Sequence, residues 1–146
     1  MDVVHLLRAV TVELDLAAAR FAHQHRLNGS DLRALIALLD AERSGVAPTP
    51  GWLAGQLQIT SASTTALVDR LTERGLLARR ADPADRRRTL LAVTQQAHKM
   101  GRDFFGPLIA RATDVLEAGF DDHERAVLHR LLAALAAGIA QPHNTA

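Results

Sequence analysis

Residues 57–94 read LQITSASTTALVDRLTERGLLARRADPADRRRTLLAVT and carry the strongest structural signals in the chain. Thr60 is a preferred N-cap residue, and the apolar residues at 67, 68 and 71 have the spacing of a buried helical stripe. Gly75 suits the left-handed residue that commonly ends a helix, and Leu76 suits the apolar position after it. The segment therefore predicts a helix that starts after Thr60 and ends at about residue 74.

A second helix is predicted before this helix, and a hairpin is predicted after it. Thr49-Pro50 indicates an N-cap followed by proline at the first helical position, so a short helix is expected to end at residue 57. Gln58 and Ile59 form the turn, with Ile59 expected in the core. Two strand-like runs, 76–80 and 89–93, are joined by the turn-forming sequence Asp82-Pro83-Ala84-Asp85. This order of elements predicts a winged helix-turn-helix.

The remaining residues have the periodicity of helices. Apolar residues are spaced helically from 3 to 21 and again from 32 to 39, where Asn28 or Ser30 could cap the second helix. Thr94 could cap a long fifth helix that Gly106-Pro107 should kink, and a last helix starts after Asp121. The tail from residue 141 is expected to fray. We predict a mainly α fold with a small β-wing and six helices, in one domain spanning 1–146 with its lobe at about 48–95.

The charge of the chain is unevenly distributed. The net charge is only +1 over 146 residues, yet the segment 70–88 holds seven arginines and only three acidic residues. A local cationic patch on a mildly acidic body is typical of nucleic-acid binding, although a solvated face of mixed charge is the simpler alternative. The charge pattern therefore favours an anionic partner for this segment.

Several other classes of protein are disfavoured. The absence of cysteine excludes disulfides and thiolate metal sites, and no apolar run approaches the length of a membrane span. The seven histidines form no cluster with helical i, i+4 spacing, so no metal site and no cofactor are predicted. No nucleophile elbow, Walker loop or dinucleotide fingerprint occurs. We expect a cytoplasmic protein without enzymatic activity or a membrane partner.

The strings LVDRLTERGLL at 67–77 and DPADRR at 82–87 together resemble the MarR family of bacterial transcriptional regulators. The resemblance implies a homodimer in which the first and last helices interlock, at about residues 2–26 and 106–140. Both ends carry apolar stripes that a chain of this length would struggle to cover by itself. The predicted interface residues are Leu6, Val10, Leu128, Leu132, Leu135 and Ile139.

The second helix of a helix-turn-helix presents its N-terminal part to the major groove. Its predicted DNA-facing residues here are Thr60, Ser61, Ala62, Ser63, Thr65 and Ala66. Short hydroxyls and methyls give weaker base readout than arginine would, so phosphate contacts and DNA shape should carry more of the specificity. Ser63 and Thr65 could alternatively be local helix-start residues.

Five arginines complete the predicted DNA surface. Arg70 and Arg74 could contact phosphate or pair with Asp69, Glu73 or an acid of the wing. The family resemblance implies that Arg87 enters the minor groove and that Asp85 stabilises the wing. The remaining two predicted DNA-binding arginines are Arg86 and Arg88, which flank Arg87. Since side chains alternate along a strand, these two are expected on the opposite side of the ribbon or at phosphates.

The sequence thus predicts a regulator that binds a pseudo-palindromic operator in double-stranded DNA, most often a repressor in this family. The resemblance also implies modulation by a small-molecule effector, but it assigns neither the effector nor its pocket residues. The alternative is a winged-helix protein-interaction module without DNA binding, because the predicted recognition helix lacks long polar side chains at its start.

Overall fold

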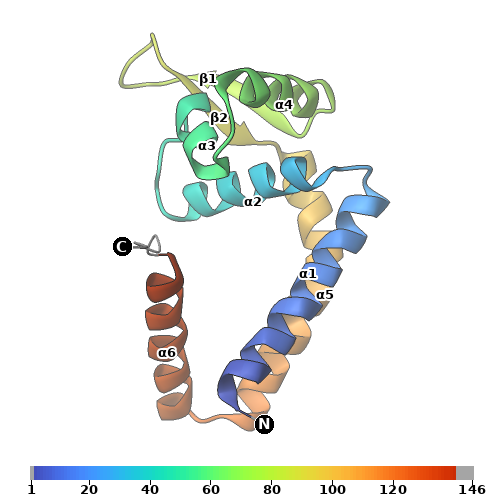
Figure 1. The fold of residues 1–146 in the computed structure, drawn as a ribbon, viewed down its shortest axis with the longest axis vertical. Coiled ribbons are helices and arrows are strands. Elements are labelled where there is room, and N and C mark those ends of the chain that lie inside the picture. Colours follow the sequence, from blue (N-terminus) through green and yellow to red (C-terminus); the bar gives the residue numbers. More distant parts are fainter. Residues whose placement is uncertain (1, 141–146) are drawn as a thin grey trace, which may run out of the picture. The chain divides into compact units, whose positions relative to one another are not determined.

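The computed structural model of the chain describes residues 2–140, so the predicted fraying from Gln141 lies outside the described residues. It contains six helices and one antiparallel two-stranded sheet, which confirms the predicted fold class (Figure 1). Strand β1 starts one residue later than expected. The elements are α1 (Val3–Gln24), α2 (Gly29–Arg43), α3 (Pro50–Leu57), α4 (Ser61–Glu73), β1 (Leu77–Ala81), β2 (Thr89–Val93), α5 (Gln95–Gly119) and α6 (Asp122–Ala140).

The chain divides into two compact units, and the boundary lies inside α5 between Arg102 and Asp103. The first unit contains every buried residue among those described, and all of them lie between Ala17 and Ala97. Within it, α2 packs against α3, α4 and β2, and α4 packs against α3 and β1. The largest apolar side chains that are almost completely buried are Leu38, Leu53, Val68, Leu71, Leu76 and Leu77. This unit therefore has a hydrophobic core of its own.

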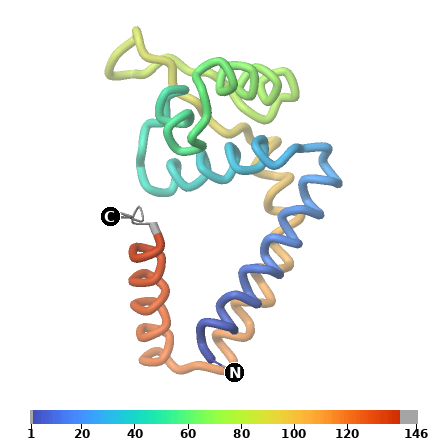
Figure 2. Tube along the Cα trace, in the orientation of Figure 1, coloured from blue at the N-terminus to red at the C-terminus, as the bar shows by residue number. Residues whose placement is uncertain are grey.

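Local capping sets the ends of α3 and α4. Thr49 accepts a hydrogen bond from the backbone N–H of Trp52, and Thr60 accepts one from that of Ser63. The tight turn between these helices, which can be followed in Figure 2, places Gln58 in the left-handed region at φ 53°. Ile59 is only partly buried there, so its predicted role as a core residue is wrong. The helix-turn-helix is thus defined by side chains within a few residues of each turn.

Gly75 is needed where α4 ends. Its φ of 70° lies in the left-handed region, and the N–H of Leu76 donates to the carbonyl of Leu71 at 2.9 Å. This is the hydrogen-bond pattern of a Schellman motif, which favours glycine because a side chain is strained at this φ. A Cβ would also lie 3.1 Å from Oε1 of Gln96. The chain can therefore turn from α4 directly into β1.

Thr94, which follows the hairpin, forms hydrogen bonds both to the segment after α4 and to the first turn of α5. Its hydroxyl donates to the carbonyl of Gly75 at 2.7 Å and accepts from the N–H of Ala97 at 3.2 Å. Its own N–H donates to the carbonyl of Leu76 at 3.1 Å. Thr94 therefore caps α5, as predicted, and at the same time holds the end of α4.

The second unit contains the rest of α5 and α6. Asp121 and Glu124 form the predicted capping box, in which each side chain accepts a backbone N–H of the other at 2.8 Å. Helix α5 continues through Gly106 and Pro107 without a break, so the expected kink there stays a prediction. No described residue of this unit is buried. The unit therefore has no core among the residues described.

Candidate nucleic-acid interface

The first two turns of α4 expose the residues that the sequence predicts to face DNA. Ser61, Ala62, Ser63, Thr65 and Ala66 are all exposed, whereas Thr64 points into the core and donates its hydroxyl to the carbonyl of Thr60 at 2.9 Å. The exposed residues form one face of short polar and methyl groups. Their contact with DNA stays a prediction, but their position on the surface agrees with it.

Some of the hydroxyl groups on this face already form hydrogen bonds within the helix. Thr65 donates its hydroxyl proton to the carbonyl of Ser61 at 3.0 Å, and the Thr60 hydroxyl donates to Oγ of Ser63 at 2.9 Å. Thr65 therefore offers a methyl group and acceptor lone pairs rather than a free donor. Such groups suit contact with a thymine methyl or with amino groups of the bases.

The start of α4 also presents backbone donors. The side chain and carbonyl of Thr60 take the N–H groups of Ser63 and Thr64, at 3.1 and 2.9 Å. The N–H groups of Ser61 and Ala62 belong to the first turn, where helix geometry supplies no intrahelical acceptor. Together with the positive end of the helix dipole, they could receive one phosphate oxygen.

Arg70 and Arg74 lie further along α4 and are bound to other parts of the first unit. Arg70 donates from Nε and Nη2 to Oδ1 of Asp31 in α2, at 3.2 and 2.5 Å. The expected pairing with Asp69, Glu73 or a wing acid is therefore wrong, because a carboxylate far away in sequence is better placed.

Arg74 likewise does not pair with a neighbouring acid. It donates to the carbonyls of His25 and Arg26, at 2.5 and 2.8 Å, where α1 ends. Asp69 pairs instead with Arg79 of β1, with 2.5 Å between carboxylate and guanidinium. The second half of α4 is thus tied to the body of the lobe by three arginines.

The wing is the loop between β1 and β2, which projects from the lobe in Figure 1. Asp85 accepts the backbone N–H of Arg87 on its side chain at 3.0 Å, and its carbonyl accepts the N–H of Arg88 at 2.9 Å. The stabilising role predicted for Asp85 is consistent with these contacts, which fold the wing tip into a turn. That turn fixes the backbone from which the wing arginines extend.

A second aspartate holds the base of the wing, and the sequence analysis missed it. Asp82 is only 5% exposed, accepts the N–H of Ala84 at 2.8 Å and lies 3.4 Å from the guanidinium of Arg88. Its own N–H donates to the carbonyl of Arg88 at 3.0 Å. Arg88 is therefore paired within the wing, which leaves fewer of its donors for phosphate than the sequence suggested.

Arg86 and Arg87 differ from their neighbour. Both side chains are exposed, and neither has a hydrogen bond or ion pair to any residue in 2–140. Residues 86–88 lie in the turn rather than in a strand, so the alternation assumed from the sequence does not apply to them. Two guanidinium groups without a partner in residues 2–140, on a hydrogen-bonded turn, are well suited to an anionic groove.

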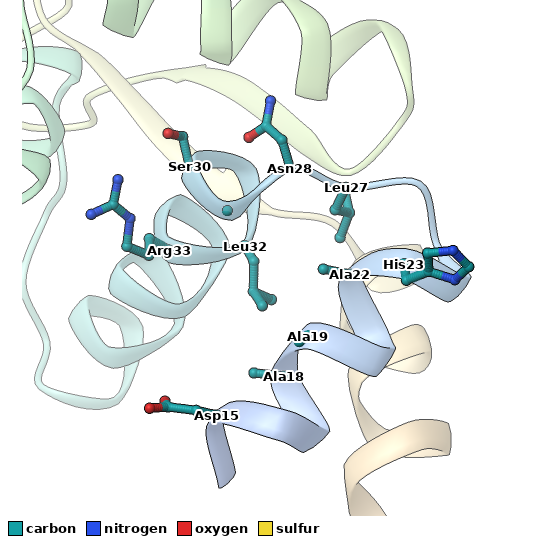
Figure 3. A pocket seen from close by; sticks show the side chains of 11 residues that line it. Asp15, Ala18, Ala19, Ala22, His23, Leu27, Asn28, Ser30, Leu32 and Arg33 are labelled. Carbon is teal, nitrogen blue, oxygen red and sulfur yellow. The ribbon is translucent and has the colours of Figure 1, made fainter. Parts of the chain in front are cut away.

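An open pocket of about 670 Å³ lies where α1 meets the start of α2 (Figure 3). Its walls are mainly apolar and include Ala18, Ala22 and Leu32. Figure 3 places Asp15 and Arg33 on one side of it. No pocket residue was predicted from the sequence, and nothing in the spacing of these small side chains would have marked them.

Other kinds of site have little support in residues 2–140. No group of three or more histidine and acidic side chains is placed to hold a metal ion in this part of the chain. None of the helices there is long and apolar enough to cross a membrane. The exposed start of α4 and the wing are thus the surface that best combines exposure with free donors.

A sequence profile described as "MarR family" matches residues 27–88, which hold α2, α3, α4, β1 and the wing. The "Uncharacterized HTH-type transcriptional regulator YcgE" of Bacillus subtilis (strain 168) is 39% identical over 67 residues. Over residues 27–88, which make up less than half of its length, the chain is therefore similar to the MarR family. The aligned residues make up 46% of the chain and 44% of YcgE, so the match spans less than half of that relative.

The chain also resembles solved structures of MepR from S. aureus, at identities that establish the fold alone. A MepR mutant from a multidrug resistant clinical isolate has a TM-score of 0.74 at 19% identity, over 95% of this chain and 98% of that one. The MepR–DNA complex has a TM-score of 0.59 at 18% identity, over 94% and 96%. MepR bound to ethidium bromide has a TM-score of 0.62 at 19% identity, over 95% and 97%.

Two buried acidic residues of this lobe escaped the sequence analysis, Asp31 because Arg70 is 39 positions away and Asp82 because its contacts depend on how the wing turn folds. Asp31 looked like a favourable first-turn acid, and its position three residues after Asn28 was the available signal of a capping box. Asp82 looked like a turn residue. Both are buried carboxylates that accept hydrogen bonds and pair with arginine.

Proposed function

We propose that the chain is a sequence-specific, double-stranded DNA-binding transcriptional regulator. The observation that carries this proposal is an exposed, hydroxyl-rich helix start combined with a wing whose Arg86 and Arg87 have no partner within residues 2–140. The helix start suits the major groove, and unpaired arginines suit the minor groove or the phosphates beside it. That MepR, a protein of the same fold, has been solved in complex with DNA supports the same use.

The chemistry of the α4 face predicts how this regulator would read its operator. Side chains as short as those of Ser61 and Ala66 cannot form the bidentate guanine contact that arginine forms. We therefore infer that phosphate contacts and the shape of the minor groove supply much of the specificity. An operator with A·T-rich flanks, where the minor groove is narrow and strongly negative, fits the two wing arginines.

Selection of bound sequences from a random pool of duplex DNA tests the proposal. The enriched sequences should form a pseudo-palindrome whose half-sites are centred about 10 base pairs apart. Fluorescence anisotropy on the selected duplex and on a scrambled one of equal composition then gives the specificity ratio. If no sequence is enriched and neither duplex binds at low salt, the chain is not a DNA-binding regulator. The protein-interaction module would then be the better assignment, since the recognition face is made of short side chains.

We further propose that the regulator is a homodimer held together by α1 and α6. Leu6 and Val10 of α1 and Leu132 and Ile139 of α6 are 49%, 56%, 52% and 71% exposed, which is unusual for so many large apolar side chains. The other two predicted interface residues, Leu128 and Leu135, are partly buried. A second copy of the chain is the partner that the family resemblance favours, and two-fold symmetry would place two winged lobes on two half-sites.

Repression and its relief by an effector form the last part of the proposal. The pocket between α1 and α2 is apolar with Arg33 and Asp15 at one side, which suits a small, mainly apolar molecule carrying one charge. MepR has been solved with ethidium bromide, so a protein of this fold binds such a molecule. An effector can weaken DNA binding only if it prefers a conformation that does not fit the operator.

The effector proposal is tested with a panel of aromatic cations, aromatic anions and neutral analogues. Ligands that raise the thermal stability of the protein should also release it from the selected duplex. Ala18→Phe should place a bulky ring in the pocket and weaken both effects while leaving DNA binding in place. An unchanged response in this variant would place the effector elsewhere.

A further inference from the structure

Two arginines at the C-terminal end of α4 are bound to residues 25–31, which we call the elbow and which comprise the link after α1 and the first turn of α2. Arg70 and Arg74 are four residues apart, so they lie on one face of α4, one turn from each other. Together they make four hydrogen bonds to the elbow, two to Asp31 and two to backbone carbonyls. The sequence analysis included both arginines in the predicted DNA surface, whereas these four hydrogen bonds place their guanidinium groups against the lobe.

The contact between Arg70 and Asp31 is a buried-carboxylate contact rather than a surface ion pair. Asp31 is 2% exposed, and its Oδ2 also accepts the N–H of Asn28 in the capping box of α2, at 3.2 Å. A buried carboxylate requires such partners, since loss of one leaves a charge without compensation. The hydrogen bond to Asp31, together with its negative charge, raises the pKa of the Arg70 guanidinium.

The contact of Arg74 closes the end of α1. His25 is the C-cap of α1, and Arg26 follows with a φ of 52° in the left-handed region. Carbonyls at a helix C-terminus lack intrahelical donors and carry the negative end of the helix dipole, so a guanidinium is a suitable partner. Arg74 supplies two donors there, from Nη1 and Nη2. The exit of α1 is thus fastened to the recognition helix.

We propose that Arg70 and Arg74 are positioning residues, which hold the recognition helix at a fixed orientation on the elbow instead of contacting phosphate. Asp31 is the third member of this group, because it is the acceptor that fixes Arg70. The inference rests on the proposed DNA-binding function and deepens it. It moves two predicted DNA contacts away from the duplex and leaves the helix start and the wing as the surface that meets it.

Substitution of Asp31 can distinguish a direct effect of the Arg70 charge on DNA affinity from an effect on the position of α4, because Asp31 carries the opposite charge. If Arg70 acted on DNA by its charge, Asp31→Asn would leave DNA affinity unchanged or raise it, because it removes a negative charge near the duplex. If the pair positions α4, Asp31→Asn should weaken binding about as much as Arg70→Gln, by about tenfold each. The double variant Asp31→Asn/Arg70→Gln should be little worse than either single one, because both remove the same link.

Salt dependence provides the second readout. Each phosphate contact contributes about one unit to the slope of the logarithm of affinity against the logarithm of salt concentration. Arg70→Gln and Arg74→Gln should weaken binding but keep the slope of the unsubstituted protein. Arg87→Gln should flatten it by about one unit for each arginine removed. Arg43→Gln, which breaks an exposed ion pair with Asp40 within α2, is the control and should change neither the affinity nor the slope.

Anisotropy titrations on the selected duplex at several salt concentrations complete the experiment, with circular dichroism to show that each variant is folded. Undiminished binding by Asp31→Asn, or a slope flattened by Arg70→Gln as much as by Arg87→Gln, would overturn this inference alone. Failure of the unsubstituted protein to bind any duplex would overturn the proposed function and this inference together. If Arg70→Gln does not fold, Arg74→Gln and Asp31→Asn carry the same test.

Discussion

The lobe between Ala17 and Ala97 and the arms, residues 2–16 and 98–140, treat their apolar side chains in opposite ways. The lobe buries its leucines and valines around α2, α3, α4 and the hairpin. The arms have no buried residue among those described, and they expose large apolar side chains such as Val3, Ile109 and Val115 by 61%, 62% and 64%. The lobe thus has a hydrophobic core within one chain, whereas the arms have none among the described residues, and their exposed apolar side chains fit the proposed cover by a second copy.

The strongest way to break this comparison is to charge the arms. We expect Val10→Asp/Leu132→Asp to make the protein monomeric, because two carboxylates on each copy would have to be buried in the proposed interface. Loss of two-site binding should then lower operator affinity by about a hundredfold or more. Light scattering after size exclusion measures the mass, and anisotropy measures the affinity. Arg130→Gln, at an exposed polar position of α6, should remain dimeric; a dimeric double variant would contradict the proposed interface.

The same substitution in the two regions sharpens the comparison. Leu71→Ala removes a side chain that is 0% exposed and should lower the free energy of unfolding by about 2–5 kcal/mol. Leu132→Ala removes one that is 52% exposed, so it should act only through the dimer. Denaturant unfolding at two protein concentrations distinguishes them. The loss in Leu71→Ala should be the same at both, and that in Leu132→Ala should depend on concentration. Equal behaviour would mean that the arms are not covered by a second copy.

Within the lobe, the wing should affect DNA binding without affecting stability. Arg87→Ala should weaken operator binding by about tenfold, the scale expected for loss of one arginine contact to DNA. Its melting temperature should be unchanged, because the side chain is exposed and has no partner in residues 2–140. Anisotropy and thermal unfolding on the same preparation test both statements. Full affinity in Arg87→Ala would remove the wing from the proposed interface.

The smallest expected effect concerns the anchor of the wing. Asp82→Asn keeps the shape of the side chain but loses the charge that pairs with Arg88 at 3.4 Å. We expect a few-fold loss of DNA affinity through a less ordered wing, and a slope against salt that matches the unsubstituted protein. Arg88→Gln is the complementary variant and should give a similar loss. A flattened slope in Arg88→Gln would show that Arg88 contacts phosphate in addition to Asp82.

Local signals in the sequence predicted the ends of helices both in the lobe and in the arms. Thr49 with Pro50, Thr60, Gly75, and Asp121 with Glu124 each act within about four residues, and the structure has the expected cap at every one. Capping depends on the residue and its near neighbours, so it is readable without the fold.

The parts that the sequence did not predict depend on distant contacts or on a mistaken local geometry. Arg70 and Asp31 are 39 positions apart, and no local pattern pairs them. The strand alternation applied to Arg86 and Arg88 was wrong because both residues lie between β1 and β2, in the turn at the wing tip. Ile59 was expected in the core from its apolar character alone, yet it lies at the rim of the turn between α3 and α4.

Thr94 has a consequence for how the molecule could respond to change. The hydroxyl group of Thr94 donates to the carbonyl of Gly75, just after α4, and also accepts the N–H of Ala97 in the first turn of α5. A displacement of either helix at this point would disturb a hydrogen bond of the same hydroxyl. We therefore expect a movement at the first turn of α5 to be transmitted to the end of α4, with the Thr94 hydroxyl as the shared contact.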